Sequence, residues 1–471
     1  MSIYRSCDIR GVAATELTPE LYQRWGCVLG NRVEPAAKFV VGGDVRGSTP
    51  RFLAALVDGL CEAGVDVVNL GQLPTPMIYH ALRRLSAAAC AIVTASHTPA
   101  EINGLKWMIG RRPPTPDDVE SLRRETQLPC PPGPPRNRSR ERVLDISYDY
   151  VACFQETWID ALGAQCHVVL DPMYGCWALR ARRYLQAIFP QCLFSAVHDA
   201  PEKGFGGQCP DCAQSESLDD LSEAVYRERA HLGIAFDGDG DRVAFVDNAG
   251  ARLTAEEAVW VLLQSMGPQL AGQRFVYDSE FSDCVPETAR RFGAEPLIER
   301  SGHSFVRTRV LEADALIGAE ASGHYFYREL GGGDDGLFTA CRMIAHLAGQ
   351  GGALADLRRQ CPPVYATPEL SVSVPQPQHH EVIEHMRAAW SGFPQAVLDG
   401  VRIDTPGGWA LVRSSVTEPA LTFRFESIDW AALDELVRRF CHTLPTFFGD
   451  ELWARYGVAM GYACNGKEDR S

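Results

Sequence analysis

The chain has 471 residues, with an apolar fraction of 46% and a charged fraction of 22%, as expected of a folded protein with roughly three or four domains. Its net charge of −15 argues against a nucleic-acid partner or an acidic membrane surface, because both require basic protein surface. The start, MSIYRSCDIRG, has no apolar leader, and no run of about 18 apolar residues follows, so we expect a cytoplasmic protein without a membrane span. The 16 scattered cysteines favour reduced thiols over a disulfide framework.

Residues 1–145 begin with alternating strand and helix patterns. Strand patterns are seen in KFVVGGD, VDVVNLG and AAACAIVTASH, and helix patterns in TPRFLAALVDGLCEAG and TPMIYHALRRL. Strands separated by helices of about 10 to 15 residues indicate βαβ units and a parallel sheet. This region is therefore predicted to be an α/β domain. It ends in a proline-rich stretch, expected to be a surface loop around one short helix, LRRET.

The alternation recurs along the chain. It returns in residues 146–250, from CHVVLDPMYG to LGIAFDGDGDRVAFVD, and in residues 251–365, from RFVYDSE to ALIGAEASGH. Residues 366–471 combine the strand-like ELSVSV and ALVRSSVTEPALTFRFES with the helical EVIEHMRAAW and AALDELVRRFCHTL. We predict three similar α/β domains with mixed, largely parallel sheets, followed by a C-terminal α+β domain. The glycine-containing loops after the strands are where open α/β sheets bind ligands.

The most informative stretch is DGDGDR, directly after the apolar run LGIAF. It places Asp237, Asp239 and Asp241 in a small volume, where they need a cation, and their oxygen ligands favour Mg²⁺. An EF-hand loop is excluded, because it requires glycine where Arg242 stands and glutamate where Asn248 stands. A guanidinium beside a metal site offers bidentate geometry to phosphate, so Arg242 points to phosphoryl chemistry. The alternative is a solvated acidic turn.

A serine, a histidine and a lysine lie close together in TASHTPAEINGLKW. Ser96 follows the apolar run AIV, His97 is its neighbour and Lys106 comes soon after. A serine hydroxyl becomes chemically useful when it is activated or phosphorylated. The alternative for this stretch is an ordinary Ser/Thr/Pro turn at the end of a strand.

Polar residues also gather in GAEASGHYF. Glu320 and Ser322 are suited to binding the vicinal hydroxyls of a sugar, with His324 beside them. The alternative is the start of a helix, for which EAS is equally suited.

The stretch RSSVTEP places hydroxyls and backbone amides around an arginine in one predicted turn. Such a group can form an anion site. The alternative is a polar β-turn. The residues concerned are Arg413, Ser414, Ser415 and Thr417.

From YRSCDIRG to RSSVTEP the motifs resemble, in order, those of the α-D-phosphohexomutase family, the phosphomannomutases and phosphoglucomutases. The resemblance implies four domains around a central cleft. It also implies a phosphoserine at Ser96, with Mg²⁺ held by its phosphoryl group and by Asp237, Asp239 and Asp241. The implied reaction interconverts hexose 6-phosphate and hexose 1-phosphate, with mannose or glucose phosphate as the expected substrate. A hexose 1,6-bisphosphate is its intermediate and activator.

The same resemblance assigns roles to single residues. Arg10 in CDIRG corresponds to an arginine near the transferred phosphate, and Lys106 to a lysine beside the phosphoserine. His303 in RSGHSF corresponds to a general acid or base, and its alternative is a structural loop histidine. The sugar-binding loop would comprise Glu320, Ser322 and His324, and the phosphate loop Arg413, Ser414, Ser415 and Thr417.

Two positions depart from the family pattern. Glu280 stands where many bacterial members have a lysine, and Val416 where an asparagine is common. Replacing a cation by an anion should weaken binding of a doubly charged phosphate. Two alternatives therefore stay open: a catalytically impaired sugar-phosphate-binding relative with a regulatory role, and a mutase for a 2-amino sugar phosphate. We expect small sugar phosphates as the binding partners and a monomer or weak oligomer.

Overall fold

The computed structural model of the chain describes residues 2–128, 141–398, 400–415 and 420–461. The chain forms two compact units, which are described separately. Unit 1 comprises Met1–Val276, Thr288–Leu297 and Gly302–Cys361, and unit 2 comprises Tyr277–Glu287, Ile298–Ser301 and Pro362–Ser471. Among the helices of these described ranges, none has the length and apolar character needed to cross a membrane.

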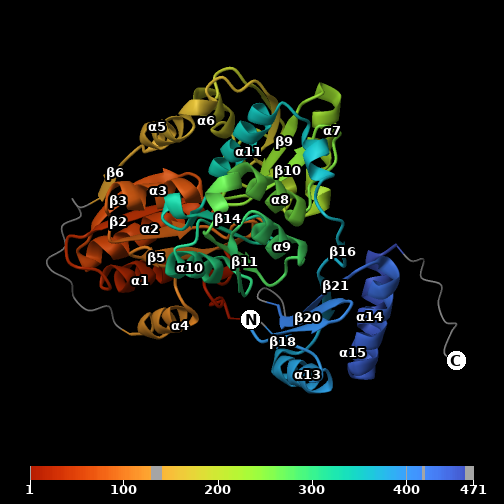
Figure 1. The fold of residues 1–471 in the computed structure, drawn as a ribbon. Helices are drawn as coiled ribbons and strands as arrows, with labels where there is room; N and C mark the ends of the chain where they lie inside the picture. The colour runs from red at the N-terminus through yellow and green to blue at the C-terminus, as the bar shows by residue number, and fades with distance from the viewer. Residues whose placement is uncertain (1, 129–140, 399, 416–419, 462–471) are drawn as a thin grey trace. The chain divides into compact units, whose positions relative to one another are not determined.

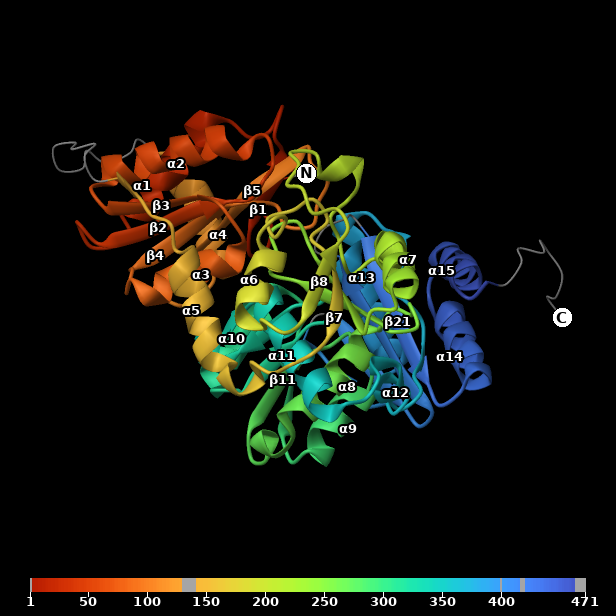
Figure 2. The same cartoon turned by 90° about the horizontal axis from the view of Figure 1, so that it is seen from above.

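The first sheet is mixed and has six strands (Figure 1). In spatial order these are β1 (Ile9–Val12), β5 (Ile102–Ile109), β4 (Ala89–Val93), β2 (Lys38–Gly43), β3 (Asp66–Gln72) and β6 (Glu141–Val143). Strands β4, β2, β3 and β6 run parallel, whereas β5 pairs antiparallel with β4 and β1. The helices of this region are α1 (Pro19–Gly30), α2 (Thr49–Ala63), α3 (Thr75–Arg84) and α4 (Pro116–Glu125). Helices α1 and α2 lie side by side (Figure 2) and bury Trp25 and Phe52 in one core with Phe39 of β2.

The second sheet, also mixed, has four strands. Their order is β10 (Val243–Asp247), β9 (Leu232–Phe236), β7 (His167–Asp171) and β8 (Leu193–Ala196). Strands β9, β7 and β8 are parallel, and β10 returns antiparallel to β9. The helices here are α5 (Ser147–Thr157), α6 (Ala181–Ile188) and α7 (Asp219–Glu228). The tight return from β9 to β10 contains the DGDGDR motif.

The third sheet has five strands. Their order is β12 (Glu295–Glu299), β11 (Arg274–Asp278), β13 (Ile317–Ala319), β14 (Tyr325–Tyr327) and β15 (Gly333–Asp334). The last three strands are antiparallel neighbours. The helices are α8 (Ala255–Met266), α9 (Cys284–Arg291), α10 (His303–Ala313), α11 (Gly336–Gln350) and α12 (Leu354–Arg358). Helix α8 begins with a capping box, in which Thr254 and Glu257 bind each other's backbone amides.

Unit 2 contains an antiparallel sheet covered by helices. Its strands are β16 (Tyr365–Ala366), β17 (Leu370–Ser373), β18 (Gln395–Ala396), β19 (Val401–Thr405), β20 (Gly408–Ser414) and β21 (Ala420–Ser427). Strand β21 pairs with β20, β16 and β17. The helices are α13 (Gln376–Ala389), α14 (Trp430–Thr443) and α15 (Thr446–Ala459), and α14 and α15 lie side by side (Figures 1 and 2).

The predicted fold class is confirmed, with three α/β regions, mixed sheets and a C-terminal α+β region. Several local expectations are corrected. Strand β5 and helix α15 were not predicted, and α4 begins at Pro116, where Thr115 and Asp118 form a capping box, rather than at Leu122. Most of the described cysteines are free thiols, as we expected. The predicted domain boundaries stay predictions.

Candidate active site

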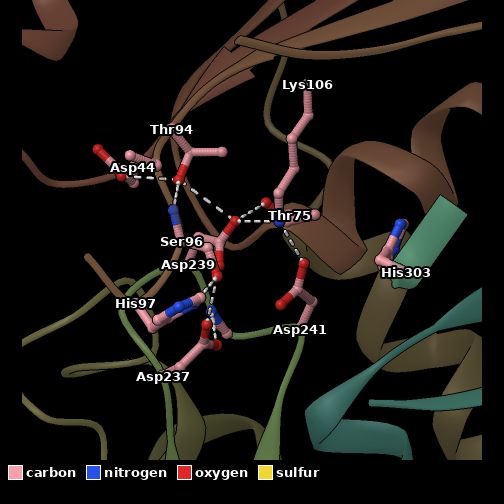
Figure 3. Close-up of polar contacts among 12 residues, drawn as sticks. Asp44, Thr75, Thr94, Ser96, His97, Lys106, Asp237, Asp239, Asp241 and His303 are labelled. Atoms are coloured by element: carbon pink, nitrogen blue, oxygen red, sulfur yellow. Dashed lines mark hydrogen bonds and ion pairs between the residues drawn. The ribbon is translucent and has the colours of Figure 1, made fainter. Parts of the chain in front are cut away.

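Ser96 lies in unit 1, three residues beyond the end of β4. Its backbone adopts φ 54°, in the left-handed region that residues other than glycine seldom occupy, and the residue is 1% exposed. The Oγ atom donates a hydrogen bond of 2.8 Å to Oδ2 of Asp237 and lies 3.2 Å from Nδ1 of His97 (Figure 3). The loop after β4 therefore presents one buried hydroxyl to the acidic turn between β9 and β10.

Arg46 holds the Ser96 loop in this shape. The side chain of Arg46 is wholly buried, and its Nε pairs with Asp44 at 2.8 Å. The two terminal nitrogens donate to the carbonyl oxygens of Ser96, Thr98, Pro99 and Ile102, at 2.8, 2.7, 2.5 and 2.9 Å. Four bonds from one planar group fix the backbone on both sides of Ser96. Arg46 was not predicted, although it follows strand β2 in the polar, glycine-containing loop GGDVRG.

The three acidic residues of DGDGDR converge in the buried turn between β9 and β10. Asp237, Asp239 and Asp241 are at most 1% exposed, and each has a carboxylate oxygen within 4.8 Å of the others. Lys106 on β5 binds Oδ2 of Asp239 at 2.9 Å and Oδ2 of Asp241 at 2.7 Å (Figure 3). Within the described part of the chain, Oδ1 of Asp239 and Oδ1 of Asp241 have no hydrogen-bond partner.

The electrostatics of this cluster fit a divalent cation. Burial and the negative charges of Asp239 and Asp241 raise the pKa of Asp237 well above its usual range. The same two carboxylates, acting against burial, raise the pKa of Lys106 well above its usual range. Three carboxylates thus share the ammonium of Lys106 and the nearby charge of Arg242, and in the described part of the chain two of their oxygens lack hydrogen bonds. Such converging hard oxygen ligands could hold a metal ion of the Mg²⁺ type.

Two arginines, Arg10 and Arg242, place positive charge near His97, the residue after Ser96. Burial, together with the charges of Arg242 and Arg10, lowers the pKa of His97 well below its usual range, so its imidazole is neutral at pH 7. Arg10, on β1, pairs with Asp8 at 2.8 Å, and its Nη1 is buried without a hydrogen-bond partner in the described ranges. Arginines beside a buried hydroxyl are suited to an anionic group on that hydroxyl.

Two predicted histidines meet at one buried carboxylate. Nε2 of His303, at the start of α10, lies 3.0 Å from Asp334, and Nδ1 of His324 lies 2.7 Å from its other oxygen. Arg242 donates to Nε2 of His324 at 3.1 Å, so the proton of that ring lies on Nδ1, facing Asp334. Together with Asp241 these residues could also form a metal-binding group, but the hydrogen bonds already satisfy Asp334. Although burial opposes it, the contacts with His303 and His324 hold the pKa of Asp334 well below its usual range.

The predicted sugar-binding residues lie in the turn between β13 and β14. Glu320 is 2% exposed, and its Oε1 accepts a hydrogen bond of 2.7 Å from the backbone amide of Gly302. Among the described residues its Oε2 has no hydrogen-bond partner, and burial raises the pKa of this carboxyl. Ser322, in the same turn, is half-buried. An acceptor oxygen without a donor is suited to a ligand hydroxyl.

The predicted phosphate loop belongs to unit 2. Arg413 and Ser414 are the last residues of β20 rather than part of a turn, and Ser415 follows them, which corrects our expectation of one compact turn. Arg413 forms ion pairs with Glu369, at 2.7 Å, and with Glu280. Thr417 and Val416 lie outside the described residues.

Sequence reasoning therefore found the hydroxyl and the acids but missed the residues that support them. Unit 1 brings Ser96, His97, Lys106 and the three aspartates into contact within one network (Figure 3). Asp44, Arg46 and Asp334 were not predicted, because part of what each contacts lies 30 or more positions away in the sequence, at Thr94, Ser96 and His303 respectively. The string GGGDDG, which holds Asp334, is the one local signal that could have drawn attention to it.

Family models match most of the chain. They describe domains I, II and III, each alpha/beta/alpha, and the C-terminal domain of phosphoglucomutase/phosphomannomutase, and they match residues 2–126, 149–250, 256–365 and 369–443. The chain is 31% identical to phosphomannomutase/phosphoglucomutase of Pseudomonas aeruginosa, over 90% of this chain and 92% of that protein. It is 27% identical to a phosphoglucomutase of Neisseria gonorrhoeae, over 93% of this chain and 95% of the relative.

Solved structures agree with these matches. A phosphoglucomutase/phosphomannomutase family protein from Burkholderia thailandensis superimposes with a TM-score of 0.83 at 28% identity, covering 97% of each chain. An N-acetylphosphoglucosamine mutase of Aspergillus fumigatus, solved with GlcNAc-6P and magnesium, shares the fold at a TM-score of 0.59 and 12% identity. The chain thus belongs to the phosphoglucomutase/phosphomannomutase family, the α-D-phosphohexomutases.

Proposed function

We propose that the protein is a phosphohexomutase that interconverts hexose 6-phosphate and hexose 1-phosphate, with mannose or glucose phosphate as substrate. The names of the relatives support these two sugars. The observation that carries the proposal is the 2.8 Å hydrogen bond from the Ser96 hydroxyl to Asp237, one of three buried, converging carboxylates. This arrangement combines a phosphate carrier with a cation site in one network.

In the proposed reaction, Ser96 carries a phosphoryl group on Oγ. A sugar hydroxyl attacks the phosphorus, the bond from phosphorus to Oγ breaks, and the sugar becomes a hexose 1,6-bisphosphate. The sugar then turns around, and its other phosphate returns to Oγ, which regenerates the carrier. A free hexose 1,6-bisphosphate activates the enzyme by supplying the first phosphoryl group.

The charged residues around Ser96 neutralise the transferring group. Mg²⁺, when bound by Asp237, Asp239 and Asp241, would supply positive charge to the phosphoryl oxygens. Arg10 brings a guanidinium with a buried nitrogen that lacks a hydrogen-bond partner within the described ranges. Lys106 fixes two of the carboxylates by its short contacts and balances part of their charge.

Proton transfer falls to the histidine pair. His303 is the candidate acid or base, because its Nε2 is held by Asp334 and its side chain is 19% exposed, more than that of His324 at 4%. Glu320 and Ser322 would bind sugar hydroxyls. His97 is neutral, and its Nδ1 can form a hydrogen bond with the unphosphorylated hydroxyl of Ser96 without adding charge to the site.

The decisive variant is Ser96→Ala. We expect turnover of mannose 1-phosphate to fall by at least about a thousandfold, as when other covalent nucleophiles are removed. Ser215→Ala, which removes an exposed hydroxyl, is the matched control and should behave as the wild type. Full activity of Ser96→Ala in a coupled assay, with both variants equally folded, would contradict the covalent mechanism.

A second candidate is a sugar-phosphate-binding relative without turnover. The contact between Glu280 and Arg413 favours it, because it reduces the positive charge available to a substrate phosphate. Calorimetric binding of mannose 1-phosphate without interconversion, in the presence of Mg²⁺ and glucose 1,6-bisphosphate, would support this candidate over the mutase.

A further inference from the structure

The guanidinium of Arg413 is held by two carboxylates of the same unit. Arg413 is 8% exposed, and its Nη2 pairs with Oε2 of Glu369 at 2.7 Å and with Oε1 of Glu280. Glu280 lies two residues beyond β11, and Glu369 immediately precedes β17. These three groups carry one positive and two negative charges, and Arg413 is the arginine that the resemblance assigns to the phosphate loop.

The segment that carries Glu280 is fixed on the sheet of unit 2. Ser282 donates to Oε1 of Glu426 at 2.9 Å, and Asp283 pairs with Arg402 at 2.5 Å. Both contacts lie within three residues of Glu280, and its backbone amide donates to Asp278 at 3.1 Å. The segment therefore presents Glu280 to Arg413 as a built feature of the fold.

We propose that Glu280, together with Glu369, acts as an internal anion that competes with substrate phosphate for Arg413 and so sets the affinity of this site. The proposal rests on the proposed function and on the assignment of Arg413 to the loop that binds a substrate phosphate. Guanidinium groups bind carboxylate and phosphate through the same planar, bidentate geometry. An incoming phosphate must accordingly displace Glu280 or share Arg413 with it, and either outcome weakens its binding.

Phosphate bound at Arg413 would also change the charge around Glu369, which pairs with the same guanidinium. Burial and the charge of Glu280 already raise the pKa of Glu369, while Arg413 and Arg424 lower it. A bound phosphate adds negative charge and takes up part of Arg413, so the pKa of Glu369 rises further and the site takes up a proton. Other charged groups also face this segment: Arg424 acts on Glu369, and Glu426 accepts from Ser282 and has its pKa raised by burial to about 7. His379 on α13 lies beside Ser414, with its Nδ1 3.1 Å from Oγ.

The central test compares binding of mannose 1-phosphate to wild type and Glu280→Gln by calorimetry, on the full chain. We expect about tenfold tighter binding by the variant, the size of one charge-assisted hydrogen bond released from competition. Glu435→Gln removes an exposed carboxylate on α14 of the same unit and should leave the affinity unchanged. In an Arg413→Gln background, Glu280→Gln should have no effect, because the shared partner is gone.

A second measurement covers the case in which Glu280→Gln is unstable. Binding to the wild type is measured at one pH in buffers of different ionisation enthalpy, which reports the protons taken up by the complex. The same measurement on Glu369→Gln gives the protons that the ligand itself takes up. We expect this variant to take up fewer protons on binding than the wild type does. Equal uptake by both proteins would overturn the proposal.

Failure of the inference and failure of the mutase proposal give different results. If the wild type catalyses interconversion and a folded Glu280→Gln variant binds no more tightly, the competition is wrong and the mutase stands. If the wild type binds without interconversion and Glu280→Gln binds more tightly, the competition stands and the mutase is wrong. If neither protein binds mannose 1-phosphate or inorganic phosphate, Arg413 is not an anion site and the competition is wrong.

Discussion

Two clusters of this protein place several carboxylates around one directly bound cation, Lys106 in unit 1 and Arg413 in unit 2. In unit 1, three buried aspartates face Lys106, and oxygens of Asp239 and Asp241 have no hydrogen-bond partner in the described ranges. In unit 2, two glutamates share Arg413, and Glu369 has a side chain that is 40% exposed and a raised pKa. Each cluster raises the pKa of one carboxylate, Asp237 in unit 1 and Glu369 in unit 2, but the oxygens of the three aspartates in unit 1 also converge, as a metal ion requires.

The sharpest way to break this comparison is to remove one ligand of the acidic turn. We expect Asp239→Asn to lower turnover by about a thousandfold and to abolish the rise in melting temperature that Mg²⁺ gives the wild type. Glu280→Gln should keep that rise, because the carboxylates of unit 2 are not expected to bind the ion. Thermal unfolding with and without Mg²⁺ measures both.

Asp239→Asn also weakens the contact with Lys106, which could lower stability by itself. The rise in melting temperature that Mg²⁺ causes separates the two effects, because loss of the Lys106 contact lowers the melting temperature equally with and without the ion. Asp117→Asn, an exposed change on α4, is the control. If Mg²⁺ raised the melting temperature of Asp239→Asn as much as that of the wild type, the ion would bind at another site.

A smaller effect is expected where a carboxylate is satisfied by two histidines. Asp334→Asn should lower kcat by about 10- to 100-fold, the usual cost of losing a residue that orients reacting groups, with little change in KM. It should also shift the pH profile of kcat, because His303 loses its ionised partner. Glu312→Gln, an exposed change on α10, is the control.

Asp334→Glu tests whether this role is one of positioning. The longer carboxylate can still pair with one histidine, so part of the activity should return. An Asp334→Asn variant with wild-type kcat and an unchanged pH profile would leave the carboxylate a structural role only.

The smallest expected effect concerns Asp335, a carboxylate that accepts hydrogen bonds but forms no ion pair with the described residues. Asp335 caps α11 by accepting from the amide of Phe338 at 3.0 Å, and it accepts from the hydroxyl of Tyr150 at 2.7 Å. Burial raises the pKa of Asp335 to about 7. Between its ordinary value of about 3.9 and this pKa, the folded protein binds more protons than the unfolded chain, so the free energy of unfolding falls as pH rises.

Asp335→Asn should remove this fall, which has a slope of at most about 1.4 kcal/mol per pH unit. The asparagine oxygen can still accept from the amide of Phe338, its Nδ2 can donate to the hydroxyl oxygen of Tyr150, and asparagine is a good helix cap. Urea unfolding of both proteins from pH 4 to pH 8 is the measurement. Parallel curves for wild type and variant would show that Asp335 is ionised throughout this range.

Local pattern was enough to predict the acidic turn and the serine. Each follows an apolar strand, and the carboxyl ends of neighbouring strands meet at one edge of an α/β sheet, so Asp237 and Ser96 could be expected near ligands. Arg46 could not be assigned in the same way, because its function lies in bonds to carbonyl groups some 50 residues away. Strand β5 was missed because Asn103 and Gly104 disrupt its apolar pattern.

At the Arg413 site of unit 2, the sequence predicted the effect of Glu280 but not its partner. The departure from the family pattern predicted weaker phosphate binding, but it did not identify the partner. Arg413 lies 133 residues further along the chain, and the contact depends on a segment that belongs to unit 2 although it follows strand β11. Helix α15 was missed because its apolar residues are divided between faces, with Phe447 and Val458 exposed and Leu452 buried.

The central claim is that Ser96 is a reusable phosphate carrier, and peptide mass spectrometry tests it most directly. The protein is incubated with glucose 1,6-bisphosphate and Mg²⁺, digested, and its peptides are compared before and after excess mannose 6-phosphate. We predict one phosphoryl group on Ser96, which is lost to the sugar and restored by fresh bisphosphate. Interconversion by a protein whose Ser96 never carries phosphate would contradict the account.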